Sequence, residues 1–476
     1  MKPRINVDSE IGTLRKLLVH SPDSGLGQVV PSKAQDWLFE DIVHLNTLRK
    51  EEYDYYIKLL LYFLDPVRIK GKLKHIDAPE QDRAFFKPAA AGFHRSDQVI
   101  EVQALLADIL EDHSIKTNLV AAVCAIEGCN YNLQRILSQT DAVKLAKIIL
   151  SGSLDDEHMI FAPIPNLIFT RDLGAVINNF VLLNKPAKKA RNRESMIMRY
   201  IFFNHPVFSD FQEHILEIPD PFQHFLRPGE DKEPGATLEG GDVMVVSPQH
   251  VLIGCSERTS PHGANEAIKM LFRHKVVEKV TVIKIPIKRD FMHIDTLFTQ
   301  VKRNMWTILA SVAKPQAINE NEPLHFFAAP AQQTTEIIQF YRNEPQKPRR
   351  FFSLEELLND ISRNDLNSTE KTQFIYSGNN VFPFDAREQW TDSCNLLALK
   401  EGVVLGYDRN DKTIQAFMDK GFQVRQAAEI IEDFESDRLN ANEIQDTLIL
   451  LPSAELSRAR GGFHCMSLPL LRDPIY

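Results

Sequence analysis

Four short stretches of the 476-residue chain place ionisable side chains next to turn residues or at the end of an apolar run. They are PNLIFTRD (165–172), LEGGD (238–242), MHIDT (292–296) and GGFHC (461–465). Each is weak evidence alone, since Glu-Gly-Gly-Asp also fits a tight turn, Arg-Asp fits a surface ion pair, and a lone cysteine is usually an inert buried thiol. Together they supply a thiol, a histidine and several carboxylates, so the chemistry has to be inferred from the set.

Three kinds of site could use such a set. A metal centre would take the histidine and the carboxylates as ligands, but the chain has no HExxH motif and no cysteine pair with zinc-ribbon spacing. A cysteine peptidase would need a histidine and an orienting Asn or Asp, and would have no use for several carboxylates in its pocket. A thiol that attacks a planar cationic carbon fits best, because two aspartates can hold a guanidinium flat while the sulfur approaches one face.

The histidine and the aspartate of MHIDT, His293 and Asp295, are two residues apart. If this segment is extended, both side chains point to the same face of it. A single pair of this kind is more often a satisfied structural pair than a functional one. The pair therefore gains weight only in combination with the other three stretches.

Alternating strands and helices must position these residues. Strands are predicted in LRKLLVHSPD near residue 20, in PNLIFTRDLGAVINNFVLLN near residue 175, in DVMVVSPQHVLIGCSE and in KVTVIKIPI. Helical patterns cover 34–64 and 97–152 and recur in GANEAIKMLFRHKV. The sequence therefore predicts a mixed α/β protein.

Two stretches depart from this alternation. Residues 65–150 begin with a Lys-rich loop and continue almost wholly helical, which predicts a helical subdomain inserted into a catalytic α/β body made of residues 1–64 and 151–476. Residues 341–373 hold a basic, Pro-containing loop and a short helix, and are predicted to be a surface excursion. Ser353 and Glu356 have the spacing of a capping box at the start of that helix.

Composition limits the class of protein. The chain is 43% hydrophobic and 25% charged, a globular profile, and its formal net charge of -9 argues against nucleic-acid binding. No apolar run reaches the roughly 18 residues of a membrane span, and the first residues have no signal-peptide core, so no membrane association and a cytoplasmic location are expected. Five scattered cysteines predict reduced thiols.

The ordered set of motifs resembles the arginine deiminase family of the guanidine-modifying amidinotransferase superfamily. The resemblance extends from INVDSEIGTLRKLLVHSPD to the last residue and rests on PNLIFTRD, ARNRES followed by FFNHP, LEGGDV, GCSERTS, MHIDTLFT and RGGFHCMSLPLLRDPIY. It implies a five-bladed pseudosymmetric α/β propeller with an inserted helical subdomain. It also implies an active site at the propeller centre, where loops from different blades meet.

The resemblance assigns roles to ten residues. Cys465 corresponds to the nucleophile, His293 to the general acid and base, and Glu239 to the carboxylate that positions His293. Asp172 and Asp295 correspond to the two aspartates that clamp the guanidinium. The implied substrate-binding residues are Asn166 and Phe169, Arg191 and Arg258 for the substrate carboxylate, and Arg460 as a mobile arginine beside the nucleophile.

The implied reaction is hydrolysis of free L-arginine to citrulline and ammonia through a covalent S-alkylthiouronium intermediate, with no metal and no organic cofactor. Arg191 and Arg258 favour a substrate with a free α-carboxylate, although Arg193 lies so close to Arg191 that their roles could be exchanged. An arginine dihydrolase, which releases ornithine and two ammonia, and a non-catalytic arginine-binding protein remain as alternatives. The sequence leaves a homo-oligomer open.

Overall fold

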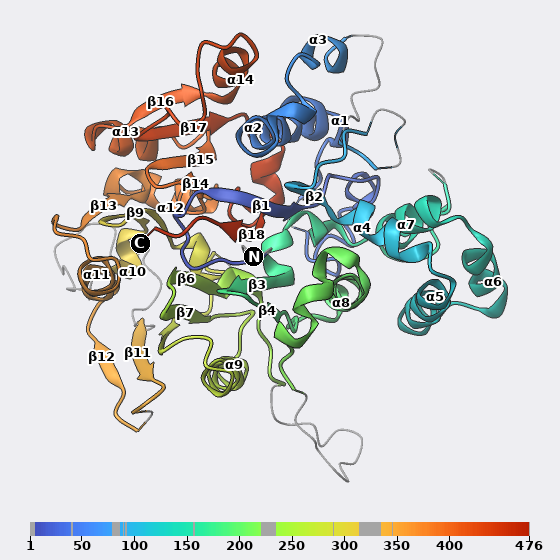
Figure 1. Ribbon diagram of the computed structural model, residues 1–476, viewed down its shortest axis with the longest axis horizontal. Helices are drawn as coiled ribbons and strands as arrows, with labels where there is room; N and C mark the ends of the chain where they lie inside the picture. Colours follow the sequence, from blue (N-terminus) through green and yellow to red (C-terminus); the bar gives the residue numbers. More distant parts are fainter. Residues whose placement is uncertain are drawn as a thin grey trace.

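The computed structural model describes residues 5–39, 41–78, 86–88, 90, 93–155, 158–219, 235–288, 290–313, 335–344 and 346–475. Within these ranges the strands form five separate sheets, with helices packed between and around them (Figure 1). The chain is therefore mixed α/β, as the sequence predicts. None of the helices in these ranges has both the length and the apolar character needed to cross a bilayer.

One three-strand unit recurs in all five sheets. An antiparallel pair comes first, and a third strand then lies parallel to the second strand of that pair. The units are β3 (Gly174–Ile177), β4 (Phe180–Leu183) and β5 (Ile215–Leu216); β6 (Val243–Ser247), β7 (His250–Cys255) and β8 (Lys279–Lys284); β9 (Phe298–Lys302), β10 (Met305–Ile308) and β13 (Gln373–Tyr376); β14 (Leu397–Lys400), β15 (Val403–Tyr407) and β17 (Thr447–Leu451); and β18 (Leu468–Arg472), β1 (Leu14–Val19) and β2 (Val99–Glu101).

The fifth unit joins the two ends of the described chain. β1 lies at the centre of its sheet, antiparallel to β18 on one side and parallel to β2 on the other. Arg472 ties this sheet to its neighbour, because its buried guanidinium donates to the carbonyls of Gly12 and Ala398 at 2.7 and 2.9 Å. The segment that carries GGFHC is thus held directly against the first strand of the chain.

Helix capping explains several helix starts. Asp112, Asn130 and Asp141 each accept a hydrogen bond from the backbone N–H three residues later. Ser353 does the same with the N–H of Glu356 at 3.1 Å, as the sequence predicts. The helices are α1 (Leu45–Thr47), α2 (Asp54–Leu64), α3 (Leu73–Ile76), α4 (Val102–Leu110), α5 (His113–Glu127), α6 (Tyr131–Gln139), α7 (Ala142–Ser151), α8 (Asn192–Asn204), α9 (Pro261–Arg273), α10 (Ala310–Ala313), α11 (Leu354–Asp360), α12 (Phe384–Trp390), α13 (Asp411–Asp419) and α14 (Ala427–Glu435).

The range 65–150 contains both helices and a strand. Helices α4 to α7 fill its second half, and α5 and α6 stand at one side of the molecule in Figure 1. β2 lies in the same range but extends the sheet of β1. The limits of an inserted subdomain therefore stay a prediction.

The prediction of a surface excursion over 341–373 is confirmed for the largely exposed edge strand β12 and the loop before it, but it was wrong for the helix that follows. β12 (Arg349–Phe351) pairs with β11 (Glu336–Tyr341), which extends the sheet of β8. Leu354 and Leu357 of α11 are buried in the hydrophobic cluster that contains Trp306. The short helix itself was predicted, but the charged residues between these apolar positions concealed that it packs on the core.

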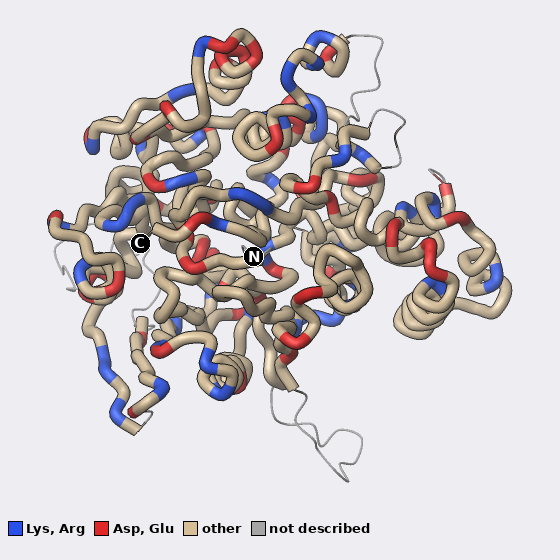
Figure 2. Tube along the Cα trace, in the orientation of Figure 1, with Lys and Arg blue, Asp and Glu red and all other residues tan. Residues whose placement is uncertain are grey.

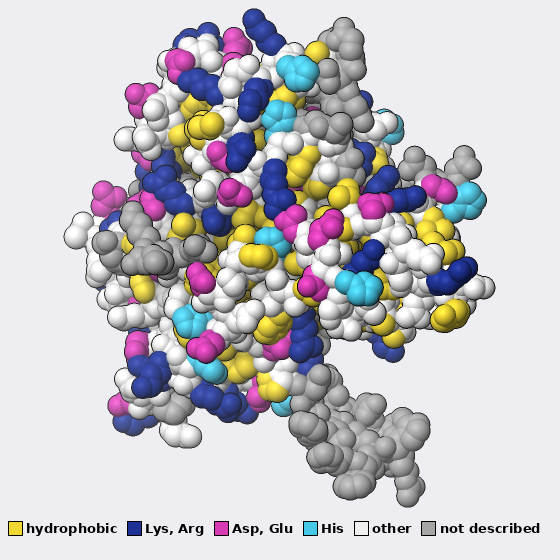
Figure 3. All heavy atoms as spheres, turned by 45° about the vertical axis from the view of Figure 1, so that its right-hand side comes forward, with side chains coloured by type: hydrophobic (Ala, Val, Ile, Leu, Met, Phe, Trp, Pro, Cys, Tyr) yellow, Lys and Arg dark blue, Asp and Glu magenta, His cyan; other side chains and the backbone are white. Residues whose placement is uncertain are grey.

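The surface carries charges of both signs. Figure 2 shows acidic and basic residues interspersed over the described elements. On the face drawn in Figure 3, hydrophobic side chains are scattered among the charged ones. This distribution suits a globular protein with a formal net charge of -9.

Glu52 anchors the turn Leu456–Ala459 that leads into GGFHC. Its buried carboxylate accepts the N–H groups of Glu455 and Leu456 at 2.8 and 2.6 Å. Glu52→Ala should lower the free energy of unfolding by about 2 kcal/mol, measured by urea denaturation, because two buried donors lose a charged acceptor. The matched control is Glu51→Ala at the exposed neighbouring position, which should change it by less than about 0.5 kcal/mol. Equal losses in the two variants would contradict the anchoring role.

Candidate active site

The four stretches found in the sequence occupy equivalent places in the fold. Each one stands immediately before the first strand of a three-strand unit: FTRD before β3, LEGGD before β6, MHIDT before β9 and GGFHC before β18. The first three end in short 3-10 turns, and GGFHC follows another such turn. The recurring architecture therefore brings together residues that are distant in the sequence, such as Arg171 and His464, which are 293 positions apart and share a hydrogen bond from the Arg171 guanidinium to the His464 carbonyl.

All ten predicted site residues meet in one place. Glu239 and Asp295 belong to it through their contacts with His293 and Cys465. The other eight line a narrow cavity of about 20 Å³: Asn166, Phe169, Asp172, Arg191, Arg258, His293, Arg460 and Cys465. A cavity of this volume holds about one water molecule, so the site is closed in this conformation.

His293 is surrounded by carboxylates. Its Nε2 lies 3.0 Å from Glu239 Oε2, and its Nδ1 lies 3.7 Å from Asp172 Oδ1. Burial lowers the pKa of His293, but Asp172, Glu239 and Asp242 outweigh burial and raise the pKa to about 10. His293 is therefore an imidazolium at neutral pH.

Arg191 is the second cation of this cluster. Its Nη1 donates to Asp172 Oδ2 at 2.7 Å and to Glu239 Oε2 at 3.1 Å, and its Nε donates to Glu194 at 2.9 Å. Burial raises the pKa of Glu239, yet Arg191 and His293 outweigh this effect and lower it to about 2. Two carboxylates and two cations thus stabilise one another in the interior.

Cys465 also lies among carboxylates, but they disfavour the charged form of a thiol. Its side chain is only 5% exposed, and its Sγ lies 3.6 Å from Asp295 Oδ2. Burial first, and then Asp295, Asp172 and Asp392, raise the pKa of the thiol well above its usual value. The thiol is therefore protonated at neutral pH while the site is empty of cationic substrate.

Asp172, Asp295, Arg191 and Arg258 each have one buried polar atom with no hydrogen-bond partner among the residues described. Two are acceptors, Asp172 Oδ1 and Asp295 Oδ1, and two are donors, Arg191 Nη2 and Arg258 Nε. Unsatisfied buried groups are costly and call for an explanation. A ligand with a cationic donor group at one end and an anionic acceptor group at the other would satisfy all four.

The remaining predicted residues complete the wall. Asn166 donates through its amide to the carbonyl of Trp37 at 2.8 Å. The ring of Phe169 lies so close to Gly461 that a Cβ there would come within 2.2 Å of it, which explains a glycine at that position. Arg460 has a left-handed backbone (φ 63°), and its guanidinium stacks 3.5 Å from the ring centroid of Trp390.

Two expectations from the sequence change. Arg193 points away from Arg191, since it pairs with Glu127 at 2.6 Å and stacks on Phe161, so it has no part in the cavity. MHIDT is not a strand, because residues 294–296 form a 3-10 turn. Asp295 accordingly bonds His464 Nδ1 at 2.8 Å.

The sequence analysis missed the loop that precedes the fifth first strand, β14. Asp392 lines the cavity, and burial raises the pKa of its carboxyl to about 7. The amide of Asn395 contacts the backbone of both Cys465 and Asp295. The polar run TDSCN just ahead of an apolar strand was the available signal, since every other first strand is preceded by a site motif.

Only one group of side chains in the described ranges has the geometry of a possible metal site: Asp172, Glu239 and His293. Arg191 Nη1 already lies between Asp172 and Glu239, and His293 is held as an imidazolium by the same carboxylates. A metal ion would have to displace this guanidinium and deprotonate the ring. The negative charge of this cluster is therefore balanced by the Arg191 guanidinium and the His293 imidazolium rather than by a metal ion.

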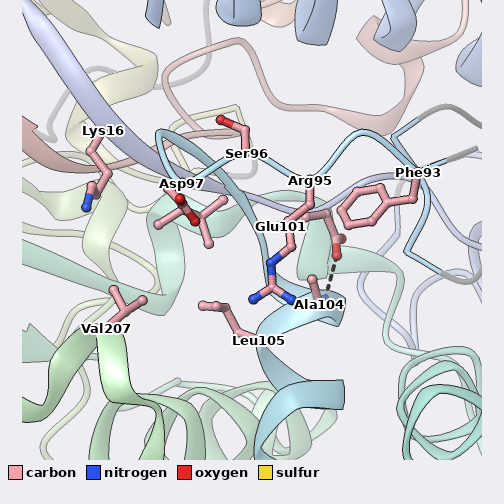
Figure 4. A pocket seen from close by; sticks show the side chains of 10 residues that line it. Lys16, Phe93, Arg95, Ser96, Asp97, Glu101, Ala104, Leu105 and Val207 are labelled. Carbon is pink, nitrogen blue, oxygen red and sulfur yellow. Dashed lines mark hydrogen bonds between the residues drawn. The ribbon is translucent and has the colours of Figure 1, made fainter. Parts of the chain in front are cut away.

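A larger cavity of about 360 Å³ lies elsewhere, near β2 and α4 (Figure 4). Two of the charged residues that line it are paired: Arg95 with Asp108 at 3.0 Å, and Glu101 with His20 at 2.8 Å. Leu105 and Val207 form part of its lining. It contains none of the ten predicted residues.

Comparisons with known proteins agree with a site for a cationic, planar substrate group and place the chain among hydrolases that act on the C–N bonds of amidines. A family model described as arginine deiminase matches residues 132–472. The chain is 30% identical over 480 residues to an arginine deiminase of Listeria monocytogenes and 28% identical over 483 residues to one of Staphylococcus haemolyticus, with 99% of each chain covered. The chain belongs to the arginine deiminase family.

Among solved structures, an amidinotransferase from Microseira wollei matches with a TM-score of 0.44 and 14% identity, over 98% of this chain and 97% of that one.

The charge around Cys465 predicts when its thiol ionises. In substrate-free protein the thiolate absorbance near 240 nm, taken as the difference from Cys465→Ser, should appear only above pH 9. Asp172→Asn should move this transition to lower pH, because it removes one of the carboxylates that raise the pKa. A thiolate already present at pH 7 in the unsubstituted protein would contradict this electrostatic description.

Proposed function

We propose that this protein is an arginine deiminase, which hydrolyses free L-arginine to L-citrulline and ammonia. The observation that carries the proposal is the pattern of unsatisfied atoms. Asp172 Oδ1 and Asp295 Oδ1 can accept from a guanidinium, and Arg191 Nη2 and Arg258 Nε can donate to an α-carboxylate. Arginine carries both groups at its two ends.

In the proposed mechanism, the Cys465 thiolate attacks the guanidinium carbon. A C–S bond forms, the C–N bond to one terminal nitrogen breaks, and the His293 imidazolium gives its proton to the departing ammonia. This step leaves an S-alkylthiouronium on Cys465. The neutral His293 then takes one proton from water, whose oxygen attacks the same carbon. The C–S bond breaks to release citrulline, and the second proton of the water passes to the departing sulfur, which restores the neutral thiol of the empty site.

Substrate binding accounts for the ionisation of the thiol. Burial first, and then Asp295 and Asp172, raise the pKa of the Cys465 thiol in the empty site. A guanidinium between these aspartates and the sulfur would neutralise their field and favour the thiolate. Glu239, 3.0 Å from His293, would keep the ring oriented and charged until ammonia leaves.

The five recurring units favour the propeller that the family resemblance implies. Each unit has the same strand directions, and four of the five loops that precede a first strand carry predicted site residues. A pseudo-five-fold arrangement would direct all five loops to a common centre. We propose that the five sheets are its blades.

Arginine cannot enter the cavity as it stands. The cavity holds about 20 Å³, and Arg191 Nη1 occupies Asp172 Oδ2. A bound guanidinium would compete for this aspartate, so Arg191 would have to shift toward the substrate carboxylate. The conformation described here therefore represents the substrate-free state of the proposed enzyme.

Product analysis tests the proposal. Purified protein with L-arginine and a chelator, and with no added cofactor, should yield citrulline and ammonia in equal amounts. Cys465→Ala should abolish turnover and still bind arginine, because the carboxylates remain in place. Ornithine with two ammonia would replace the deiminase by a dihydrolase, and binding without any product would indicate an arginine-binding protein.

Charge reversal tests the carboxylate contact. Arg258→Glu should raise the KM for arginine by about 100-fold or more, because a donor to the α-carboxylate becomes a repelling charge. The matched control is Arg273→Glu at the exposed end of α9, which should leave the KM unchanged. An unchanged KM in Arg258→Glu would remove this residue from the substrate site.

A further inference from the structure

In four of the five three-strand units, the loop before the first strand contributes predicted site residues. The loop before β14 is the equivalent loop of the remaining unit. Within this loop, Asn395 is 1% exposed and belongs to none of the motifs that carry the family resemblance. It lies directly against the loop that holds Cys465. A Cβ on Gly462 would come within 2.5 Å of the Asn395 carbonyl oxygen, so the two loops pack backbone to backbone.

The hydrogen bonds of Asn395 define how its amide is oriented. Cys465 donates its backbone N–H to Asn395 Oδ1 at 3.0 Å, and Asn395 Nδ2 donates to the backbone carbonyl of Asp295 at 3.1 Å. A backbone N–H can only donate and a carbonyl can only accept, so a flipped amide would lose both bonds. One side chain therefore joins the backbone of the predicted nucleophile to that of a predicted clamp residue.

We propose that Asn395 is a positioning residue for the reaction, whose amide fixes the Cys465 sulfur against the Asp295 carboxylate. The inference rests on the proposed function. The sulfur and Asp295 Oδ2 lie 3.6 Å apart, and the guanidinium carbon has to be held between the thiol and its clamp. An error of about 1 Å in this spacing is enough to cost about 100-fold in rate.

The electrostatics of the thiol give Asn395 a second effect. Burial and three carboxylates raise the pKa of Cys465, whereas the hydrogen bond from the Asn395 side chain lowers it. Asn395 thus opposes the field of the carboxylates without adding a charge that would repel the cationic substrate.

The test compares Asn395→Ala with Asn304→Ala. Asn304 is also a buried asparagine with a side-chain amide hydrogen bond, which it donates to Glu370 at 2.8 Å, but it lies in the turn between β9 and β10, away from the cavity. Asn395→Ala should lower kcat about 100-fold and change KM by less than about threefold. Asn304→Ala should lose similar thermal stability and keep its kcat. Equal kcat values in the two variants would overturn the proposal.

Thiol reactivity provides a readout that does not depend on turnover. The rate at which methyl methanethiosulfonate modifies Cys465 at pH 8 should fall about tenfold in Asn395→Ala, because a smaller fraction of the thiol is ionised. A purely structural role would instead loosen the loop and expose the thiol, so a faster reaction would also overturn the proposal. If the unsubstituted protein makes no citrulline, the proposed function fails. The rate of Cys465 modification would still show whether Asn395 affects the ionisation of the thiol.

Asn395→Asp keeps the shape of the side chain and covers the case in which Asn395→Ala does not fold. An ionised carboxylate can accept the N–H of Cys465 but repels the carbonyl of Asp295, whereas a protonated carboxyl can make both bonds. The kcat of this variant relative to the unsubstituted protein should therefore rise at least tenfold as pH falls from about 8 to 5. A pH-independent ratio would contradict the bridging role of the amide.

Discussion

Buried negative charge is the constraint that the rest of this structure satisfies. Six carboxyl groups are buried within one site, and removing negative charge from water is affordable there only if cations lie among these groups. Arg191 and the His293 imidazolium are those cations, and each contacts more than one carboxylate. The six are Asp172, Glu194, Glu239, Asp242, Asp295 and Asp392.

Asp242 shows how such a carboxylate also organises the backbone. It accepts from Ser256 Oγ at 2.6 Å and from the N–H of Ile294 at 3.0 Å, so it fastens the LEGGD turn to the MHIDT turn. The first of these turns leads into the buried strand β6, and the second leads into the buried strand β9. Side chains mounted at the starts of strands are held more rigidly than side chains on long loops, which is what a reaction with narrow distance requirements needs.

The sequence predicted which residues form the site better than it predicted which of them contact one another. All ten residues are brought together, because motifs beside apolar strands carry local signals for both the strand and the turn. The ion pair between Arg191 and Asp172 had no such signal, since its charges meet only after folding. Likewise, the hydrophobic period predicted β1, β3, β4 and β6 to β8, but it identified neither the strands after β8 nor the order of the sheets. The charged residues around Leu354 and Leu357 concealed that the predicted short helix packs on the core.

The closed cavity also bears on oxidation chemistry. Oxidation of a cysteine to a sulfenic acid follows the thiolate fraction and the exposure of the sulfur, and both are low for Cys465 while the cavity is empty. Peroxide would meet a buried, protonated sulfur in a narrow cavity that Arg460 also lines. The same carboxylates that would clamp an incoming guanidinium therefore protect the thiol of the empty site from oxidation. Substrate binding would make the sulfur both reactive and vulnerable to oxidation.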